Sequence, residues 1–340
     1  MASYTSTIII TGGTLGLGYW ATYELAAKFP DCKIIIASRT NKDNAPRQIE
    51  KMLSQKRGIT ESPSFPQVEF MSLDLASTTK VREFVKTYAA QGHPPISSLL
   101  LNAGLQFHSG KDLRLSPDGV ESTFAVNHVG HALLLFLLKP YLARECRIVI
   151  TASGVHDPAQ KTMVPDAVYD SAELLAHPTD SDGYEVKQKG LQRYSSSKLA
   201  NVLFTYALER RLKPARDSGR NNWTVVSMDP GLMPDTSLGR DLGPVINWIA
   251  HNILVRMLWF LRLFIGPNVH TSAESGKNLA TLGEARGAEA TKTSGQYYEG
   301  ARPIDSSVDS HVEEKQEDLW KWTVNFLAQD DKERKAFETF

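Results

Sequence analysis

Residues 8–18 read Ile8-Ile9-Ile10-Thr11-Gly12-Gly13-Thr14-Leu15-Gly16-Leu17-Gly18, and this segment sets the fold class that we predict. A short apolar run leads into a glycine-rich loop, and a helical stretch follows from Tyr19 to about Lys28. Strand, glycine turn and helix in this order are the context that a dinucleotide-binding turn requires. The segment therefore predicts the first βα unit of a dinucleotide-binding α/β fold.

The glycines of this turn have separate roles, although their spacing is Gly-x-x-x-Gly-x-Gly rather than the commoner Gly-x-Gly-x-x-Gly. Gly12 allows the tight turn, Gly16 removes a side chain where the backbone approaches the pyrophosphate, and Gly18 lets the helix pack closely on the strand. The helix N-terminus offers unpaired N–H groups to the phosphates. We expect the cofactor to contact the turn at Gly12, Thr14, Leu15, Gly16, Leu17 and Gly18.

The second predicted strand, from Lys33 to Ser38, bears on the choice of cofactor. NAD-binding sites usually carry an acid here for the ribose 2′-hydroxyl, whereas this chain has Ser38 and then Arg39. Because guanidinium geometry matches a phosphate, we predict NADP(H) over NAD(H). The alternative is that Arg39 is only a solvated cation, since the glycine turn holds no Lys or Arg to reinforce the preference.

The composition limits the class of protein. The chain has 340 residues, 41% of them hydrophobic and 22% charged, with a formal net charge of +0, which gives no electrostatic case for nucleic acid. Two cysteines form neither a zinc motif nor a disulfide framework, so we expect no metal and a reducing compartment, the cytoplasm. The N-terminal residues lack the pattern of a signal peptide. The βα alternation continues without a linker, which predicts one domain over residues 1–340.

Further strands are predicted along the chain, each followed by a polar or glycine-containing segment. They are Val68 to Leu73 before Asp74-Leu75, Ile96 to Leu101 before Asn102-Ala103-Gly104, Arg147 to Ala152 before Ser153, and Asn222 to Met228 before Pro230-Gly231. A long helix is expected from Val120 to about Leu138, stopped by Pro140. Ligands of open parallel sheets bind outside the carboxyl ends of the strands, so these segments should meet in one crevice of a doubly wound α/β domain with about seven strands.

The most informative polar segment is Tyr194-Ser195-Ser196-Ser197-Lys198, which places a phenol and an ammonium one helical turn apart. A phenol with a pKa of about 10 is a poor proton donor or acceptor near neutrality. We expect the neighbouring ammonium to favour the phenolate and so lower the pKa of Tyr194. Alone, such a pair is more often a half-buried Tyr beside a solvated Lys, but the surrounding motifs favour proton exchange with an alcohol or carbonyl oxygen.

Taken together, these motifs resemble those of the short-chain dehydrogenase/reductase superfamily over about residues 5 to 236. The matching positions are Thr11 to Gly18, Asp74-Leu75, Asn102 to Gly104, Asn127, Ser153, Tyr194, Lys198 and Pro230-Gly231. The segment from Ser197 to Phe204 resembles the retinol-dehydrogenase and protochlorophyllide-reductase branch.

The resemblance implies a role for each of these residues. Tyr194 would give a proton to the substrate carbonyl oxygen, Ser153 would hold that oxygen, and Lys198 would bond the nicotinamide ribose. Asn127 would order a water that links Lys198 to solvent. The implied cofactor contacts also include Asp74, Leu75, Asn102, Ala103, Gly104, Pro230, Gly231 and Thr236. Taken singly, Ser153 could instead cap a strand end, Asn127 could accompany a helix kink, and Asp74 could cap the next helix.

Two segments depart from the family pattern. The interval between Ser153 and Tyr194 is long, and we interpret the insertion at 155–190 as a substrate wall rather than a surface loop. His156 in it is expected to be solvated. The second segment, 242–266, is densely apolar but interrupted by polar residues, so it is not a spanning helix. We favour a lid over a hydrophobic substrate; a membrane-surface helix and a core or subunit-contact helix stay open.

These inferences predict an NADP(H)-dependent oxidoreductase that interconverts a ketone or aldehyde and an alcohol on a hydrophobic small molecule, such as a polyketide, terpenoid, steroid or retinoid-like compound. Reduction is the favoured direction. Two rivals remain: a catalytically silent NADP-binding regulator, and a non-redox isomerase, cyclase or dehydratase. A homodimer and peripheral membrane contact are further expectations. The C-terminal region around Trp320 is expected to form a solvated amphipathic helix.

Overall fold

The computed structural model of the chain describes residues 4–58, 66–107, 113–178, 189–235, 259, 262 and 267–340. These residues form one eight-stranded sheet in the order β3-β2-β1-β4-β5-β6-β7-β8. The strands are β1 Ser6–Thr11, β2 Cys32–Ser38, β3 Val68–Ser72, β4 Ile96–Leu101, β5 Leu142–Thr151, β6 Asn222–Asp229, β7 Tyr297–Glu299 and β8 Arg302–Ile304. Every pairing is parallel except β7 with β8. The predicted doubly wound parallel sheet is confirmed, and β8 adds a short antiparallel edge.

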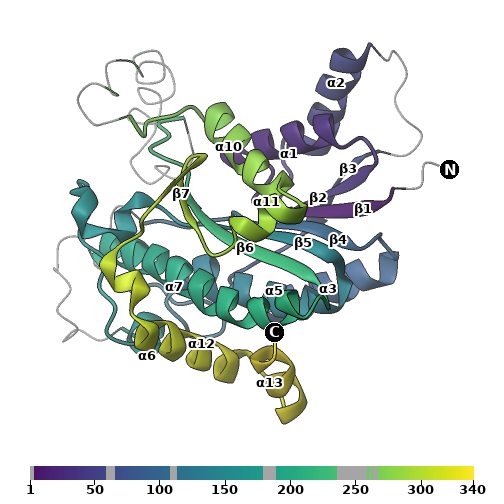
Figure 1. Cartoon of the computed structure of the whole chain (residues 1–340). Coiled ribbons are helices and arrows are strands. Elements are labelled where there is room, and N and C mark those ends of the chain that lie inside the picture. The colour runs from purple at the N-terminus through teal and green to yellow at the C-terminus, as the bar shows by residue number, and fades with distance from the viewer. Residues whose placement is uncertain are drawn as a thin grey trace.

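Helices cover both faces of the sheet (Figure 1). One layer holds α1 Gly16–Lys28, α2 Ala45–Arg57, α10 Ser272–Glu284 and α11 Gly287–Lys292. The opposite layer holds α3 Thr78–Gln91, α5 Gly130–Leu138 and α7 Lys189–Asp217, with α6 Ala172–Ala176, α12 Glu313–Leu327 and α13 Asp331–Glu338 outside it. Both faces of the strands are therefore buried, as expected for parallel sheets.

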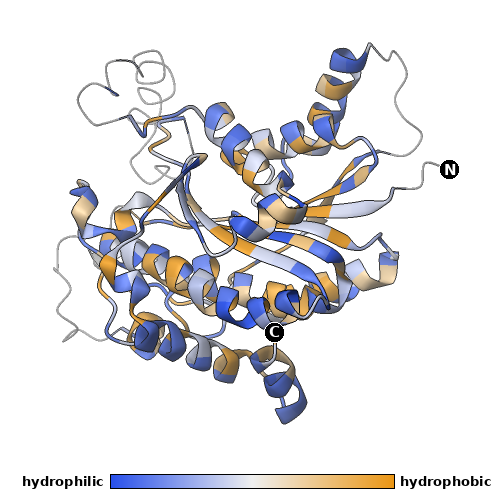
Figure 2. Cartoon of the chain, viewed as in Figure 1, coloured by the Kyte–Doolittle hydropathy of each residue, from blue (hydrophilic) through white to orange (hydrophobic). Residues whose placement is uncertain are grey.

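The apolar pattern of the strands explains this arrangement. Ile8 and Ile10 of β1 pack into the core under α1 and α2, whereas Ile9 between them packs into the core under α3, α5 and α7. Side chains alternate across a strand, so a continuous apolar run supplies both cores. Figure 2 shows apolar residues along the strands and on helix faces turned towards the sheet, with hydrophilic residues on outward helix faces.

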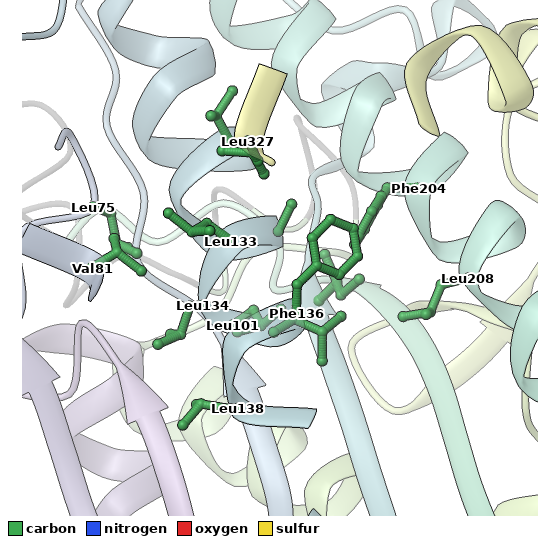
Figure 3. Packing of buried hydrophobic residues seen from close by; sticks show 14 of the residues in the cluster. Leu75, Val81, Leu101, Leu133, Leu134, Phe136, Leu138, Phe204, Leu208 and Leu327 are labelled. Atoms are coloured by element: carbon green, nitrogen blue, oxygen red, sulfur yellow. The ribbon is translucent and has the colours of Figure 1, made fainter. Parts of the chain in front are cut away.

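The larger core centres on α5, whose sequence GHALLLFLL is buried at nearly every position. Figure 3 shows Leu133, Leu134 and Phe136 of α5 lying among side chains from α3, α7 and α12. A helix that is apolar all round is typical of a core position. The strands that precede the predicted site residues pack on this core through side chains such as Leu101 and Ile150.

The helix predicted from Val120 to Leu138 is interrupted. It consists of a short α4, Ser122–Phe124, a π-helical segment, Ala125–Val129, and then α5. Asn127 lies within the π segment. Such one-turn π segments are rare inside helices and occur frequently at functional sites.

The C-terminal helices are packed rather than solvated, which corrects the expectation for this region. Trp320 of α12 is 1% exposed and stacks on Phe204 of α7, with 5.3 Å between ring centroids. Phe337 of α13 stacks on Phe136 of α5 at 4.8 Å. Polar residues dominate the composition of α12, but they lie on the outward side of an amphipathic helix whose apolar side is buried.

Replacing Trp320 with Ala should lower the free energy of unfolding by about 3–5 kcal/mol, because it leaves a cavity between α7 and α12. Val308→Ala is the control, since Val308 is 87% exposed and should change stability by less than about 0.5 kcal/mol. Chemical denaturation of both variants measures the difference. Equal stabilities would show that the α12 contact is energetically unimportant.

The insertion at 155–190 is described over its first part and at its end. Tyr169 is buried, and its hydroxyl donates to Asp318 Oδ2 on α12 at 2.8 Å. The backbone N–H of Ala172 donates to the same oxygen at 2.8 Å. This half of the insertion is anchored to the C-terminal helix and is not a free surface loop.

Candidate active site

The predicted residues meet at the carboxyl edge of the sheet, around the point between β1 and β4 where the strand order reverses. Ligands of doubly wound sheets bind at such a switch point. A cavity there has in its wall Gly12, Thr14, Leu15, Gly16, Leu17, Gly18, Ser38, Arg39, Asp74, Leu75, Asn102, Ala103, Gly104, Tyr194, Lys198 and Pro230. Asn127, Ser153 and Gly231 are not in that wall. Thr236 lies outside the described residues, as does the 242–266 segment except for Trp259 and Arg262.

The glycine turn leaves no room for side chains. A Cβ on Gly18 would lie 2.5 Å from the carbonyl oxygen of Gly12 and 2.8 Å from Nδ2 of Asn102. Gly12 has φ of 71°, in the left-handed region, and its Cβ would approach the Ala103 backbone to 3.0 Å. The turn and the Asn102–Gly104 segment are thus in direct backbone contact, and that contact shapes a cradle for an elongated ligand.

A hydrogen-bond chain connects the turn to the π segment. The Thr11 hydroxyl accepts the N–H groups of Asn102 at 2.8 Å and Ala103 at 2.9 Å, and it lies 2.8 Å from His131 Nε2. His131 Nδ1 lies 3.1 Å from the Asn127 carbonyl oxygen. A carbonyl only accepts, so Nδ1 carries the proton and Nε2 accepts from Thr11. Burial lowers the pKa of His131 to about 4, which keeps the ring neutral. This role could not be predicted from the sequence, because His131 lies in an otherwise apolar helix.

Asn127 is 1% exposed and fully bonded. Its Oδ1 accepts the Leu105 N–H at 2.7 Å, and its Nδ2 donates to the Leu105 carbonyl at 3.1 Å and to Ser197 Oγ at 2.9 Å. A Cβ on Gly104 would lie 3.8 Å from both Asn127 Oδ1 and Lys198 Nζ. Asn127 therefore holds the Asn102–Gly104 segment beside Lys198; its ordering of a water stays a prediction.

Tyr194 lies in the wall of the cavity, and Ser153 lies next to it, just behind that wall. Tyr194 on α7 is 7% exposed, and Ser153, just after β5, hydrogen-bonds its phenol. Burial raises the pKa of Tyr194 above its usual value, and the charge of Asp229 adds to the rise, while the Ser153 bond lowers it. The predicted lowering of this pKa was wrong: desolvation of the phenol raises it, and Lys198 is not among the groups that shift it.

Lys198 is buried one turn along α7, at 2% exposure. Its ammonium donates to the Thr151 carbonyl at 3.0 Å and lies 5.4 Å from the centre of the Tyr194 ring. Burial lowers the pKa of Lys198 to about 8, and the charge of Asp229 opposes that lowering. The group is an ammonium at neutral pH and loses its proton as the pH rises through about 8.

The part of the cavity wall next to the ends of β2 and β3 includes Ser38, Arg39 and Asp74. The buried Ser38 Oγ has no hydrogen-bond partner among the described residues, and neither does the exposed Arg39 guanidinium. Asp74 Oδ1 accepts the Ala76 N–H at 3.0 Å. Ser77, not Asp74, caps α3 by accepting from Lys80 N–H, so the capping alternative for Asp74 does not hold.

Two residues near Ser153 were missed or misread from the sequence. His156 is 1% exposed rather than solvated, and its Nδ1 lies 2.8 Å from the Ser153 carbonyl oxygen. Asp229 ends β6 immediately before Pro230-Gly231 and is 5% exposed. An acid directly after the predicted strand Asn222 to Met228, beside a predicted ligand turn, was the available signal for Asp229.

The fold and the cavity agree with the comparisons to known proteins. Residues 6–171 match the family described as short chain dehydrogenase. Short-chain dehydrogenase TIC 32 A, chloroplastic, of Brassica napus is 34% identical over 75% of this chain and 70% of its own. Polyprenol dehydrogenase of Danio rerio is 31% identical, over 92% of this chain and 84% of its own. Retinol dehydrogenase 14 of Mus musculus is 32% identical, over 69% of this chain and 63% of its own.

Among solved structures, an uncharacterised protein from Mycobacterium paratuberculosis has a TM-score of 0.61 at 24% identity, covering 95% of this chain and 93% of its own. That likeness concerns the fold alone. The sequence relatives extend over most of the chain and carry the conclusion further: this chain belongs to the short-chain dehydrogenase/reductase superfamily.

Proposed function

We propose that the chain reduces a ketone or aldehyde on a hydrophobic small molecule with NADPH. The observation that carries the proposal is that one cavity joins the glycine turn to a buried Tyr194–Lys198 pair, with Ser153 bonded to the phenol. Membership in an oxidoreductase family supports redox chemistry on a nicotinamide cofactor. The choice of NADPH, the substrate and the direction are the parts proposed here.

The residues present fit a dinucleotide. Gly18 lets α1 begin in contact with the Gly12 carbonyl and Asn102, and the N-terminus of α1, which no side chain caps, offers free N–H groups to a pyrophosphate. The partnerless Ser38 Oγ and the Arg39 guanidinium lie where a ribose 2′-phosphate would be recognised. Asp74 and Leu75 would border the adenine, Asn102 to Gly104 the adjoining ribose, and Pro230, Gly231 and Thr236 the nicotinamide.

When bound, the reduced nicotinamide supplies a hydride. Tyr194 would donate its proton to the carbonyl oxygen of the substrate, and Ser153 would hold that oxygen by a hydrogen bond that strengthens as charge develops on it. The raised pKa of Tyr194 keeps the phenol protonated at neutral pH, which is the form that donates a proton. Lys198 would orient the nicotinamide ribose and stabilise the phenolate that forms, and Asn127 would connect Lys198 to solvent.

A hydrophobic substrate is proposed from two observations. The curated relatives are named for polyprenol and retinol, which are apolar alcohols. The apolar segment 242–266 follows the Pro230-Gly231 turn in the sequence, which suits a lid over such a molecule. The insertion at 155–190 would supply another wall of the substrate site.

Arg39→Asp should shift cofactor preference towards NADH, because it removes the phosphate-binding cation and adds an acid for the ribose hydroxyls. A charge-assisted contact is worth about 1.5–3 kcal/mol. Its loss should therefore lower the ratio of kcat/KM with NADPH to kcat/KM with NADH by about 10- to 100-fold. Arg39→Lys is the matched control, because it keeps the positive charge but removes the planar guanidinium that can donate two hydrogen bonds to one phosphate. An unchanged ratio in Arg39→Asp would remove Arg39 from cofactor recognition.

The proposed reaction is tested with purified protein, NADPH and a panel of apolar ketones and aldehydes. We expect NADPH to be consumed in proportion to the alcohol formed, with apolar substrates preferred to their short polar analogues. Binding of NADPH without consumption on any substrate would support a silent regulator. Product formation without NADPH consumption would support a non-redox isomerase, cyclase or dehydratase.

We propose the cytoplasm as the location, with peripheral membrane contact as the alternative. Cys32 and Cys146 are both buried free thiols, which suits a reducing compartment. Within the described ranges, no helix has both the length and the apolar composition needed to cross a membrane.

A further inference from the structure

His156 is a buried histidine in the short 3₁₀ segment Gly154–His156, which follows Ser153. Its backbone N–H donates to the Ser153 carbonyl oxygen at 3.1 Å, and its ring Nδ1 lies 2.8 Å from the same oxygen. On the other side of the ring, the backbone N–H of Ser307 donates to Nε2 at 3.1 Å. Both ring nitrogens therefore bond to main-chain groups, and these two groups are far apart in the sequence.

These two contacts fix the protonation state of the ring. A carbonyl oxygen only accepts hydrogen bonds, and a backbone N–H only donates them. Nδ1 must therefore carry the proton that reaches the Ser153 carbonyl, and Nε2 must offer its lone pair to Ser307. A charged ring would place a second N–H against the Ser307 N–H, and burial also lowers the pKa of His156. The arrangement requires the neutral Nδ1–H form.

The segment that receives the imidazole, residues 306–310, is itself bonded to α7. The N–H and the hydroxyl of Ser310 donate to the Ser307 carbonyl oxygen at 3.0 and 2.6 Å. The Ser306 hydroxyl lies 2.7 Å from the Ser310 hydroxyl and 2.6 Å from the Tyr206 hydroxyl on α7. The 306–310 segment is therefore tied to the helix that carries Tyr194.

We propose that His156 is a positioning residue: through its imidazole, the 306–310 segment holds the Ser153 main chain and so fixes where the Ser153 hydroxyl meets the substrate oxygen. The inference rests on the proposed function in taking Ser153 as the group that holds that oxygen. Displacement of a reacting group by about 1 Å can lower a rate by about 10²-fold. A bond that holds the Ser153 carbonyl can therefore act on kcat while His156 touches neither substrate nor cofactor.

Two substitutions of His156 separate positioning from packing. His156→Phe keeps a ring against Tyr297, whose ring centre lies 4.8 Å from that of the imidazole, but removes both hydrogen bonds of the side chain. His156→Asn leaves a cavity but keeps an N–H donor as far from the backbone as Nδ1. Both are assayed as full-length protein with NADPH and an apolar ketone that the wild type reduces.

His156→Phe should lower kcat by about 10-fold, with KM and NADPH affinity near the wild-type values. The split is expected because the Ser153 bond to the substrate oxygen strengthens in the transition state. His156→Asn should retain more of kcat than His156→Phe, because it can still hold the Ser153 carbonyl. Wild-type kcat in His156→Phe, or a loss in His156→Asn as large as in His156→Phe, would overturn the proposal.

His128→Phe is the matched control for the loss of a buried, bonded imidazole. The His128 ring is also buried and stacks on Phe124, and its Nε2 lies 2.8 Å from the Thr323 hydroxyl on α12. His128 is not in the wall of the cavity. We expect this variant to unfold at a lower denaturant concentration than the wild type but to keep its kcat. An equal loss of kcat in both Phe variants would show that packing, not positioning, explains the effect.

A measurement on the wild type tests the same bonds without a variant and without turnover. In full-length protein labelled with ¹⁵N at histidine, long-range ¹H–¹⁵N correlation spectra distinguish the two neutral forms of each ring from the charged form. Nuclear Overhauser contacts with the Tyr297 ring identify His156. We expect the Nδ1–H form at neutral pH. The Nε2–H form or a charged ring would overturn the proposal, whether or not the variants fold.

The inference and the proposed function can therefore fail separately. A wild-type protein that never consumes NADPH with any carbonyl compound would overturn the proposed reaction, while the form of the His156 ring would still be measured. Normal turnover in the wild type together with an unchanged kcat in His156→Phe would overturn the role of His156 alone.

Discussion

Tyr194→Phe should lower kcat by about 10²- to 10⁴-fold, the range expected when a general acid is removed. The phenyl ring fills the same buried space, so the substitution removes only the hydroxyl that Ser153 bonds and that would protonate the substrate. NADPH affinity should stay within a few-fold of the wild type, because the glycine turn and Arg39 are untouched. Steady-state kinetics and fluorescence titration of NADPH separate the two effects.

Tyr169→Phe is the matched control for this experiment. It also removes a buried hydroxyl, but one that bonds Asp318 on α12, away from the cavity. We expect it to lower stability by about 1 kcal/mol and to leave kcat near the wild-type value. Wild-type turnover in Tyr194→Phe would remove Tyr194 as the proton donor and, with it, the proposed mechanism.

Gly18→Ala should weaken NADPH binding by about 10- to 100-fold. The new methyl group would meet the Gly12 carbonyl oxygen at 2.5 Å, which is backbone and cannot rotate away. The free variant would relieve the clash by moving α1 away from the turn, and cofactor binding would have to restore the original geometry. Overpacking costs about 1–3 kcal/mol, which corresponds to the stated loss of affinity. Isothermal titration calorimetry measures it.

Gly92→Ala separates the clash from a general effect of adding a methyl group. Gly92 ends α3 with φ of 65°, and nothing lies within 4 Å of its Cβ position. The substitution should cost about 1 kcal/mol of stability through backbone strain, with NADPH affinity unchanged. If both variants bind NADPH as the wild type does, the close approach of α1 to the turn is not needed for the cofactor.

Most of the fold could be predicted because its signals are local. The Ile8-Ile9-Ile10 run is apolar on both sides of the strand, and the structure buries both sides. The glycine spacing required a tight turn between β1 and α1, and the topology then brought the strand ends together. Tyr194 and Lys198 face one cavity for the same reason, since one helical turn separates them.

What escaped prediction depends on contacts between distant residues. Asp229 is enclosed by Gly154 and Asn268, neither of which is near it in the sequence. The direction of the Tyr194 pKa shift depends on how completely the assembled fold excludes water from the phenol. Trp320 is buried only because α12 returns to α7. The roles of Thr236 and of the 242–266 segment stay predictions.

The C-terminal helices have a consequence for self-association. With Phe337 and Phe340 against Phe136 of α5, and Trp320 against Phe204 of α7, the chain's own tail occupies the outward surface of both helices. A second copy could dock on that surface only if α12 and α13 moved away, which would expose these aromatic rings to water. Any homodimer in which α12 and α13 stay in place must therefore form through a different face of the molecule.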